Sequence, residues 1–368
     1  MRIIEGEDVN ELYWRGMNML RTDGREENSR VGPVKVMPEG VISVYRNPRQ
    51  RVLLDFKRAA NPFFHLYESL WMLAGRNDVM ALNRYITDFG TRFAESNGEV
   101  HGAYGHRWRK AFGFDQLDEI VRRLKANPRD RQAVLQMWDA RPPFETVAGA
   151  PYDGKANVGC NDLLGDWKDR PCNTQVYFRL RDVVEVDGLV GSYTTENGMW
   201  PILDMLIMCR SNDIVYGAYG ANAVHFSILH EYMAGRLGVI MGKMEQLSYN
   251  YHAYTDVLAR VGCPSHCEAY KQQDIKSYPM GTIWEAWDKD LEYFMSWHRT
   301  LVEAGVTEPG NYTNSWFRNT AEPMFIAHFK WKQAMQKEAR TMVGLIEAED
   351  WRFAAMQWFD VRSSARSR

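Results

Sequence analysis

Apolar residues recur every three or four positions in several stretches of the chain, the spacing that places them along one face of a helix. This pattern predicts helices at 7–21, 62–74, 116–126 and 222–237. Asn61 and Pro62 suit the first turn of the second helix, and Gly238 suits the end of the fourth. Continuous or alternating apolar runs predict strands at 41–46, 51–56, 133–139, 174–181, 203–209 and 242–251.

The order of these elements predicts an α+β fold in which helices pack on a sheet. The composition changes after Pro279, which predicts a first domain at 1–278 and a helical C-terminal extension at 279–368. In the extension, tryptophan-rich helical patterns at 283–304 and 322–345 precede a basic end, SSARSR, that we expect to fray. A segment rich in Pro, Gly, Asp and Asn at 141–170 predicts a surface insertion.

Charge and cysteine content narrow the class of protein. The 45 Lys and Arg residues nearly balance 47 Asp and Glu residues, so there is no long-range attraction for nucleic acid or an anionic membrane. The N-terminus lacks the pattern of a signal peptide, and five cysteines without framework spacing indicate reduced thiols in the cytoplasm. Cys263, His266 and Cys267 resemble half of a zinc site, but no second half follows, so we expect no metal.

The first candidate catalytic and binding residues lie at the ends of two predicted strands. Cys172 follows a proline at the start of a strand, and Arg210 follows a strand together with Ser211 and Asp213. A guanidinium beside a thiol favours the nucleophilic thiolate, and it can also grip a phosphate. The alternatives are a buried, inert cysteine and a surface ion pair.

Three further residues have both a structural and a functional interpretation. Glu68 lies within an apolar helix, where it is either exposed or buried with a raised pKa that suits proton handling. Tyr104 lies between glycines, which would let the backbone approach a ligand closely. The alternative is a tyrosine in a turn whose ring packs on the core. Asn222 opens a helix, as a cap or as a carboxamide that reads the edge of a pyrimidine.

Taken in order, these segments resemble the thymidylate synthase family, which includes viral pyrimidine-nucleotide hydroxymethylases. The resemblance covers roughly 30–254. The residues that carry it are Ser29-Arg30, the Glu68–Trp71 helix with Gly75, Ala103-Tyr104-Gly105 with Trp108-Arg109, Asp130-Arg131, Pro171-Cys172, Arg210-Ser211-Asn212-Asp213 with Gly217, and Tyr249 with His252. It implies the mixed sheet with packed helices of that family.

The resemblance also implies a reaction. Cys172 would add to C6 of a pyrimidine nucleoside 5′-monophosphate, and C5 would then take a one-carbon unit from 5,10-methylenetetrahydrofolate. Glu68 would order water and move protons, and Tyr104 would assist removal of the C5 proton. The remaining implied roles are phosphate binding by Arg30, Arg210 and Ser211, phosphate binding by Arg131 from the second subunit of a homodimer, nucleotide contacts by Tyr249 and His252, and folate contacts by Asp213 and Phe93.

Several positions depart from the synthase pattern. The synthases have arginine, cysteine and two histidines where this chain has, respectively, Gln132, Asn212, Asn173 and Leu247. Gly90 falls where synthases carry a tryptophan that shields the methylene intermediate, and the chain lacks their apolar C-terminal tail. A site open to water favours hydroxymethylation over methylation, with thymidylate synthase as the alternative.

Alternatives also exist for the pyrimidine base that is recognised and for the class of protein. With one inserted residue, Asn222 falls where synthases read uracil, which favours dUMP, but a flipped amide also fits dCMP. A non-catalytic nucleotide- or RNA-binding relative is the alternative from another class. The presence of Cys172, Glu68, Tyr104 and Arg210 together argues against it.

Overall fold

The computed structural model describes residues 1–140, 162–163, 166–182, 184–185, 193–194, 200–264 and 269–366. Most of the predicted insertion at 141–170 therefore lies outside the described residues. His266 and Cys267 of the half zinc motif lie outside them as well.

A mixed eight-stranded sheet forms the centre of the described chain, in the order β1-β4-β10-β9-β6-β5, with β3 pairing with β10 and β2 with β3. Its strands are β1 (Arg2–Gly6), β2 (Arg25–Ser29), β3 (Gly32–Val36), β4 (Val41–Tyr45), β5 (Val134–Gln136), β6 (Asn173–Arg181), β9 (Ile202–Asp213) and β10 (Ile240–Tyr254). β7 (Val184–Glu185) and β8 (Tyr193–Thr194) form a separate pair. The two long central strands β9 and β10 run parallel, while β6 is antiparallel to β9. This topology confirms the predicted α+β class.

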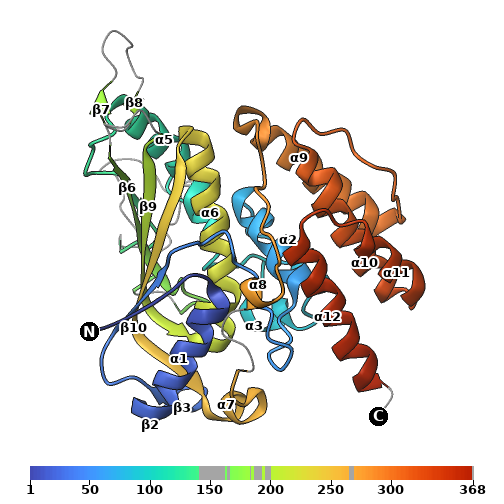
Figure 1. The fold of residues 1–368 in the computed structure, drawn as a ribbon, viewed down its shortest axis with the longest axis horizontal. Helices are drawn as coiled ribbons and strands as arrows, with labels where there is room; N and C mark the ends of the chain where they lie inside the picture. The colour runs from blue at the N-terminus through green and yellow to red at the C-terminus, as the bar shows by residue number, and fades with distance from the viewer. Residues whose placement is uncertain are drawn as a thin grey trace, which may run out of the picture.

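The helices cover one face of this sheet (Figure 1). They are α1 (Val9–Asp23), α2 (Pro62–Leu73), α3 (Phe89–Phe93), α4 (Tyr104–Arg109), α5 (Gln116–Ala126), α6 (Asn222–Leu237), α7 (Thr255–Val261), α8 (Ala269–Gln272), α9 (Trp287–Ala304), α10 (Glu322–Lys332), α11 (Gln336–Gly344) and α12 (Glu349–Arg366). Short 3₁₀ turns occur at Leu82–Arg84 and Trp284–Ala286, and π-helical turns at Ile214–Ala221 and Phe317–Ala321. The predicted helices at 116–126 and 222–237 match α5 and α6 at both ends.

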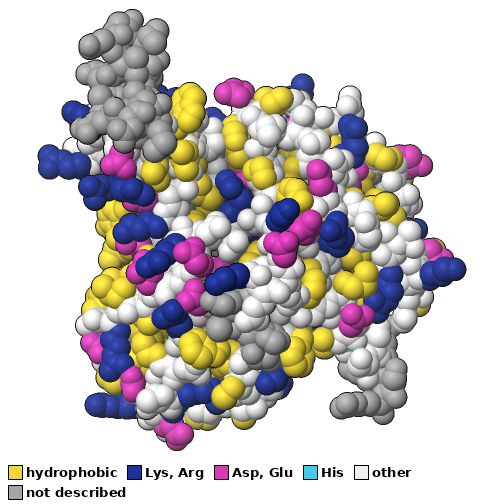
Figure 2. All heavy atoms as spheres, viewed as in Figure 1, with side chains coloured by type: hydrophobic (Ala, Val, Ile, Leu, Met, Phe, Trp, Pro, Cys, Tyr) yellow, Lys and Arg dark blue, Asp and Glu magenta, His cyan; other side chains and the backbone are white. Residues whose placement is uncertain are grey.

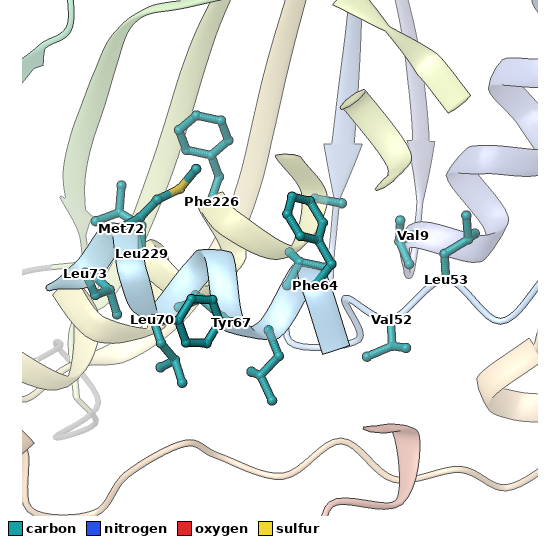
Figure 3. Packing of buried hydrophobic residues seen from close by; sticks show 14 of the residues in the cluster. Val9, Val52, Leu53, Phe64, Tyr67, Leu70, Met72, Leu73, Phe226 and Leu229 are labelled. Atoms are coloured by element: carbon teal, nitrogen blue, oxygen red, sulfur yellow. The ribbon is translucent and has the colours of Figure 1, made fainter. Parts of the chain in front are cut away.

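Helices α6 and α2 form successive layers behind the sheet. α6 packs on β9 and β10, α2 packs on α6, and the C-terminal helices lie on the far side of α2 (Figure 1). All twelve residues of α2 are buried, because protein covers the helix on every side. Figure 3 shows Met72 of α2 on the same side of the helix as Phe226 and Leu229 of α6 in this shared core.

The expected strand at 51–56 is wrong, although Val52, Leu53 and Leu54 are buried. The backbone of this segment hydrogen-bonds to side chains instead of a neighbouring strand. Val52 N–H donates to the Tyr270 hydroxyl at 3.1 Å, Leu54 N–H donates to Asn10 Oδ1 at 2.7 Å, and Asn10 Nδ2 donates to Val52 O at 3.1 Å. A buried backbone needs hydrogen-bond partners, and here side chains distant in sequence supply them.

The C-terminal extension differs in detail from its prediction. The helix expected at 322–345 is divided into α10 and α11 near Ala334, which adopts a left-handed backbone (φ 61°). Of the end expected to fray, residues 363–366 belong to α12, and residues 367–368 lie outside the described part of the chain. Trp358 and Phe359 of α12 contact the ring of Phe63 on α2, with ring centroids 5.3 and 5.4 Å away. Aromatic packing therefore joins the extension to α2.

The surface in the view of Figure 2 shows Lys and Arg side chains interspersed with Asp and Glu. Among the described residues, no helix is both long and apolar enough to span a membrane.

Candidate active site

Cys172 lies directly before β6, where the backbone of β9 holds it in place. The Arg210 N–H on β9 donates a 2.9 Å hydrogen bond to the Cys172 carbonyl. The Arg210 guanidinium also donates to the backbone, from Nε to Pro171 O at 3.1 Å and from Nη2 to Arg170 O at 3.2 Å. The thiol and the exposed guanidinium are therefore fixed beside each other by neighbouring strands.

Burial governs the state of the Cys172 thiol. Removal from water raises its pKa, and the nearby Arg210 cation lowers it by a smaller amount. The carboxylates of Asp169 and Asp213 raise the pKa further. Arg210 thus lowers the pKa of the thiol as expected from the sequence, but burial has the larger effect and raises it.

Tyr104 approaches the nucleophile from α4. The backbone N–H of Asn173, the residue after Cys172, donates to the Tyr104 hydroxyl at 3.4 Å. Burial raises the pKa of Tyr104 well above its ordinary value, so the phenol stays protonated. Gly105 allows the close approach of α4 to α2, because a Cβ on Gly105 would lie 1.8 Å from Met72 O.

Glu68 is buried on α2, which excludes its exposed alternative. Its Oε2 lies 3.0 Å from Nε2 of His225 on α6. The His225 ring does not direct an aligned N–H at this oxygen, so the two groups make a close contact rather than a hydrogen bond. The packing of α2 against α6 creates this pair.

The Asn222 amide belongs to a buried chain of side chains. Asn222 Nδ2 donates to Asn212 Oδ1 at 3.1 Å, and Asn212 Nδ2 donates to Ser248 Oγ at 3.1 Å. Gly217 leaves room for this chain, because a Cβ there would lie 2.6 Å from Asn212 Oδ1. The chain orients the Asn222 amide and leaves its Oδ1 and its second Nδ2 hydrogen available to a ligand.

Asp213 ends β9 and caps the π-helical turn that follows. Its Oδ1 accepts the N–H groups of Val215 and Tyr216 at 2.7 and 3.0 Å. Its Oδ2 is buried and has no hydrogen-bond partner among the described residues. Burial raises the pKa of Asp213, while the backbone N–H groups and, to a smaller extent, His252 lower it.

The other predicted residues differ in how close they come to Cys172. Arg30 is exposed in the turn between β2 and β3, and it interacts electrostatically with Tyr254, as do Asp213 and Cys172. Ser211 is half-buried on β9, next to Arg210. Of these residues, Asp213 interacts electrostatically with Cys172 itself, whereas Arg30 is related to Cys172 only through Tyr254.

The other four predicted residues lie on β10, on α3 and between α5 and β5. Tyr249 is 71 % exposed on β10, and His252 is half-buried, opposite Asp213 in the sheet register. Phe93 ends α3 and packs on Phe89 with ring centroids 4.8 Å apart. Arg131 is exposed between α5 and β5.

Two residues near the site were not singled out from the sequence. His225 lies within the helix predicted at 222–237, and its place one turn after Asn222 is a usable signal. Asp169 was treated as part of the insertion, yet burial raises its pKa to about 6, and it interacts electrostatically with Glu68 and Cys172. Among the described residues, no group of three or more His, Cys, Asp or Glu side chains is placed to hold a metal.

Comparison with known proteins bears directly on this arrangement. The family model described as "Thymidylate synthase" matches residues 13–277. The chain belongs to the thymidylate synthase family. The match spans every candidate residue, from Arg30 to His252.

Two of the relatives are phage enzymes. The chain is 37 % identical to the deoxyuridylate hydroxymethyltransferase of Pseudomonas phage M6, over 99 % of this chain and 95 % of that relative. It is 33 % identical to the deoxyuridylate hydroxymethyltransferase of Bacillus phage SP01, over 70 % of this chain and 60 % of that relative. The crystal structure of thymidylate synthase from T4 phage matches with a TM-score of 0.47 and 18 % identity, over 67 % of this chain and 78 % of that chain.

Proposed function

We propose that the protein transfers a one-carbon unit to C5 of dUMP and that water completes the reaction, giving 5-hydroxymethyl-dUMP. The observation that carries the proposal is the placement of a half-buried thiol, Cys172, beside the Arg210 guanidinium. The 37 % identity with a deoxyuridylate hydroxymethyltransferase, along almost the whole of both chains, supports the same activity.

The nucleotide phosphate binds to Arg210, Ser211 and Arg30. Cys172 adds to C6 of the pyrimidine, which makes C5 nucleophilic. Because burial favours the neutral thiol, Cys172 has to lose its proton as it attacks. Tyr104, whose hydroxyl contacts the residue after Cys172, assists removal of the C5 proton, and Glu68 handles protons through ordered water.

Asn222 reads the base. Its free Oδ1 accepts the uracil N3–H, and its remaining Nδ2 hydrogen is donated to O4. With Asn222 Nδ2 donating to Asn212 Oδ1, the amide has the orientation that suits uracil, which favours dUMP over dCMP. The sugar lies toward Tyr249 and His252.

Asp213 and Phe93 are the residues that would hold a folate. The buried Asp213 Oδ2, which lacks a partner among the described residues, suits N–H donors of a pterin, and the Phe93 ring provides a flat apolar surface. When bound, 5,10-methylenetetrahydrofolate supplies the one-carbon unit. Asp213 orients this group and Phe93 packs against it.

Gly90 on α3 supports water as the final reactant. It has no side chain at the position where the family resemblance places a shielding tryptophan. The Gly90 N–H donates to Asn83 Oδ1 at 2.7 Å, and an added Cβ would lie 3.0 Å from Asn83 Nδ2, so a bulky residue does not fit without rearrangement. The alternative, thymidylate synthase, requires water to be excluded here.

The active form is a homodimer in which Arg131 of each subunit binds the phosphate in the other. In Figure 1 the described helices lie on one side of the sheet, which leaves the opposite sheet face available to a second subunit. An exposed Arg131 suits a role across that interface.

The first test is the product mass after incubation with 5,10-methylenetetrahydrofolate and either dUMP or dCMP. A gain of about 30 Da on dUMP, the mass of CH2O, supports the proposal, whereas a gain of about 14 Da, the mass of CH2, establishes methylation instead. No product from either nucleotide would favour the non-catalytic alternative. Cys172→Ser serves as the control and should give no product.

A further inference from the structure

His225 is a buried imidazole without a hydrogen bond in the described part of the chain. Its side chain is 3 % exposed, and neither Nδ1 nor Nε2 has a hydrogen-bonded partner there. Buried polar groups normally have partners, and an unpartnered one often marks a place where water or a ligand binds. The Glu68 carboxylate, 3.0 Å from Nε2, is the closest charged group.

His225 lies on the same helix as Asn222, the residue proposed to read the base. It lies three residues after Asn222 on α6, so both side chains share one face of the helix. His65, which is on α2 three residues before Glu68, is also buried, and burial lowers its pKa well below the ordinary value, so it stays neutral. His225 therefore brings Glu68 of α2 to the helical face that also carries Asn222.

We propose that His225, together with Glu68, holds and deprotonates the water that attacks the methylene group on C5. This role rests on the proposed function, which includes a water step. A water molecule bonded to His225 would satisfy a ring nitrogen that the protein leaves unpaired. His225 was absent from the residues assigned by family resemblance, so it adds a group to the reaction.

The step balances without an oxidant or reductant. The water oxygen forms a bond to the methylene carbon, the methylene π electrons move into the ring to give an enolate at O4, and the water proton passes to the His225–Glu68 pair. The enolate then collapses, the bond between C6 and sulfur breaks, and Cys172 leaves as a thiolate. The nucleotide gains CH2OH in place of the hydrogen on C5.

The experiment compares His225→Gln with the unaltered protein, using dUMP labelled with tritium at C5. Glutamine retains hydrogen bonding but accepts no proton at neutral pH. Release of tritium reports the steps before water attacks, and the yield of hydroxymethylated product reports the water step. His230→Gln is the matched control: His230 is a buried histidine on the same helix, and its Nε2 contacts Leu203 O at 2.7 Å instead of Glu68.

We expect His225→Gln to lower product formation about 100-fold, the scale of a lost general base, while tritium release falls less than about threefold. Added 2-mercaptoethanol, whose thiolate needs no base at the site, should then trap the methylene group as a thioether. His230→Gln should keep the two rates equal.

If tritium release and product formation fall together in His225→Gln, the proposal is overturned, and His225 serves only to position Glu68. Unchanged rates also overturn it. A mass gain of about 14 Da by the unaltered protein removes the water step itself, so failure of the proposed function is recognised before any variant is made.

Discussion

The Asn222 amide donates to Asn212 Oδ1 at 3.1 Å, so the residue proposed to read the base is held by a residue where the synthases carry cysteine. A cysteine is a weak hydrogen-bonding group and would not fix an amide in the same way. Ser248 completes the chain from β10. The departure from the synthase pattern at Asn212 thus has a structural consequence at the base.

Asn212→Ala should weaken discrimination between dUMP and dCMP. Loss of one hydrogen bond from a buried amide costs about 1 kcal/mol, so kcat/KM for dUMP should fall roughly fivefold while that for dCMP falls less. Steady-state kinetics with both nucleotides measure the ratio. Asn222→Ala should remove most activity with either base, and an unchanged ratio in Asn212→Ala would exclude the orienting role.

Cys172 should alkylate faster as pH rises. Burial raises its pKa, so the reactive thiolate becomes more populated with increasing pH and reaches no plateau at roughly pH 8 to 9, where an ordinary thiol ionises. Arg210→Met removes the cation that lowers this pKa and should slow alkylation at pH 8 about threefold or more. Iodoacetamide labelling followed by peptide mass spectrometry resolves Cys172 from the exposed Cys263. Arg210→Lys, which retains the charge, should alkylate more nearly like the unaltered protein.

Local sequence signals located much of the fold. Asn222 to Leu237 was predicted at both ends because a helical pattern is followed by Gly238, which adopts φ 72°. The segment at 51–56 was predicted wrongly as a strand. Its backbone hydrogen bonds go to Asn10 and Tyr270, which no local sequence pattern connects to it. The division of α10 from α11 at Ala334 also lacked a signal, since alanine rarely adopts a positive φ.

The family resemblance supplied the candidate residues, and membership of that family is confirmed by the match over 13–277. The roles of the individual residues remain predictions. The contact between Glu68 and His225 could not be predicted, because it depends on how α2 packs against α6. The raised pKa of Cys172 was missed for a similar reason: burial is a property of the folded chain.

Asp350 should make the stability of the protein fall as pH rises. Burial raises its pKa from 3.8 to about 7, and its Oδ2 accepts the Tyr270 hydroxyl at 3.1 Å. Between these values the folded chain holds a proton that the unfolded chain releases, so stability is full below about pH 4 and is lost as pH rises through about 7. Asp350→Asn should be more stable than the unaltered protein at pH 8, by up to about 4 kcal/mol.

Urea unfolding at pH 5 and pH 8 measures this difference in free energy. Asp360→Asn is the control, because Asp360 is 61 % exposed and its ion pair with Arg340 lies at the surface. The Asp350 assignment is wrong if both variants change stability equally at the two pH values.

Gly105→Ala should destabilise the fold. The added Cβ would lie 1.8 Å from Met72 O, so α4 would have to move away from α2 and carry Tyr104 with it. Overpacking of this kind typically costs about 1–3 kcal/mol, and kcat should fall as well because Tyr104 moves. Gly344→Ala is the matched control, since a Cβ at that helical glycine meets nothing within 4 Å. Thermal unfolding of both variants compares them; equal melting temperatures would contradict the close approach of α4 to α2.

Arg131 should act across the subunit interface, and mixed dimers test this. Cys172→Ser and Arg131→Ala should each be weakly active or inactive alone at low dUMP concentration. A mixed dimer has one site that combines Cys172 of one subunit with Arg131 of its partner, so random mixing should restore about a quarter of the original activity. Mixing Cys172→Ser with Arg30→Ala is the control: Arg30 is proposed to act within its own subunit, so no activity should return. If the Arg131 mixture also fails to recover, the phosphate contact either lies within one subunit or does not involve Arg131.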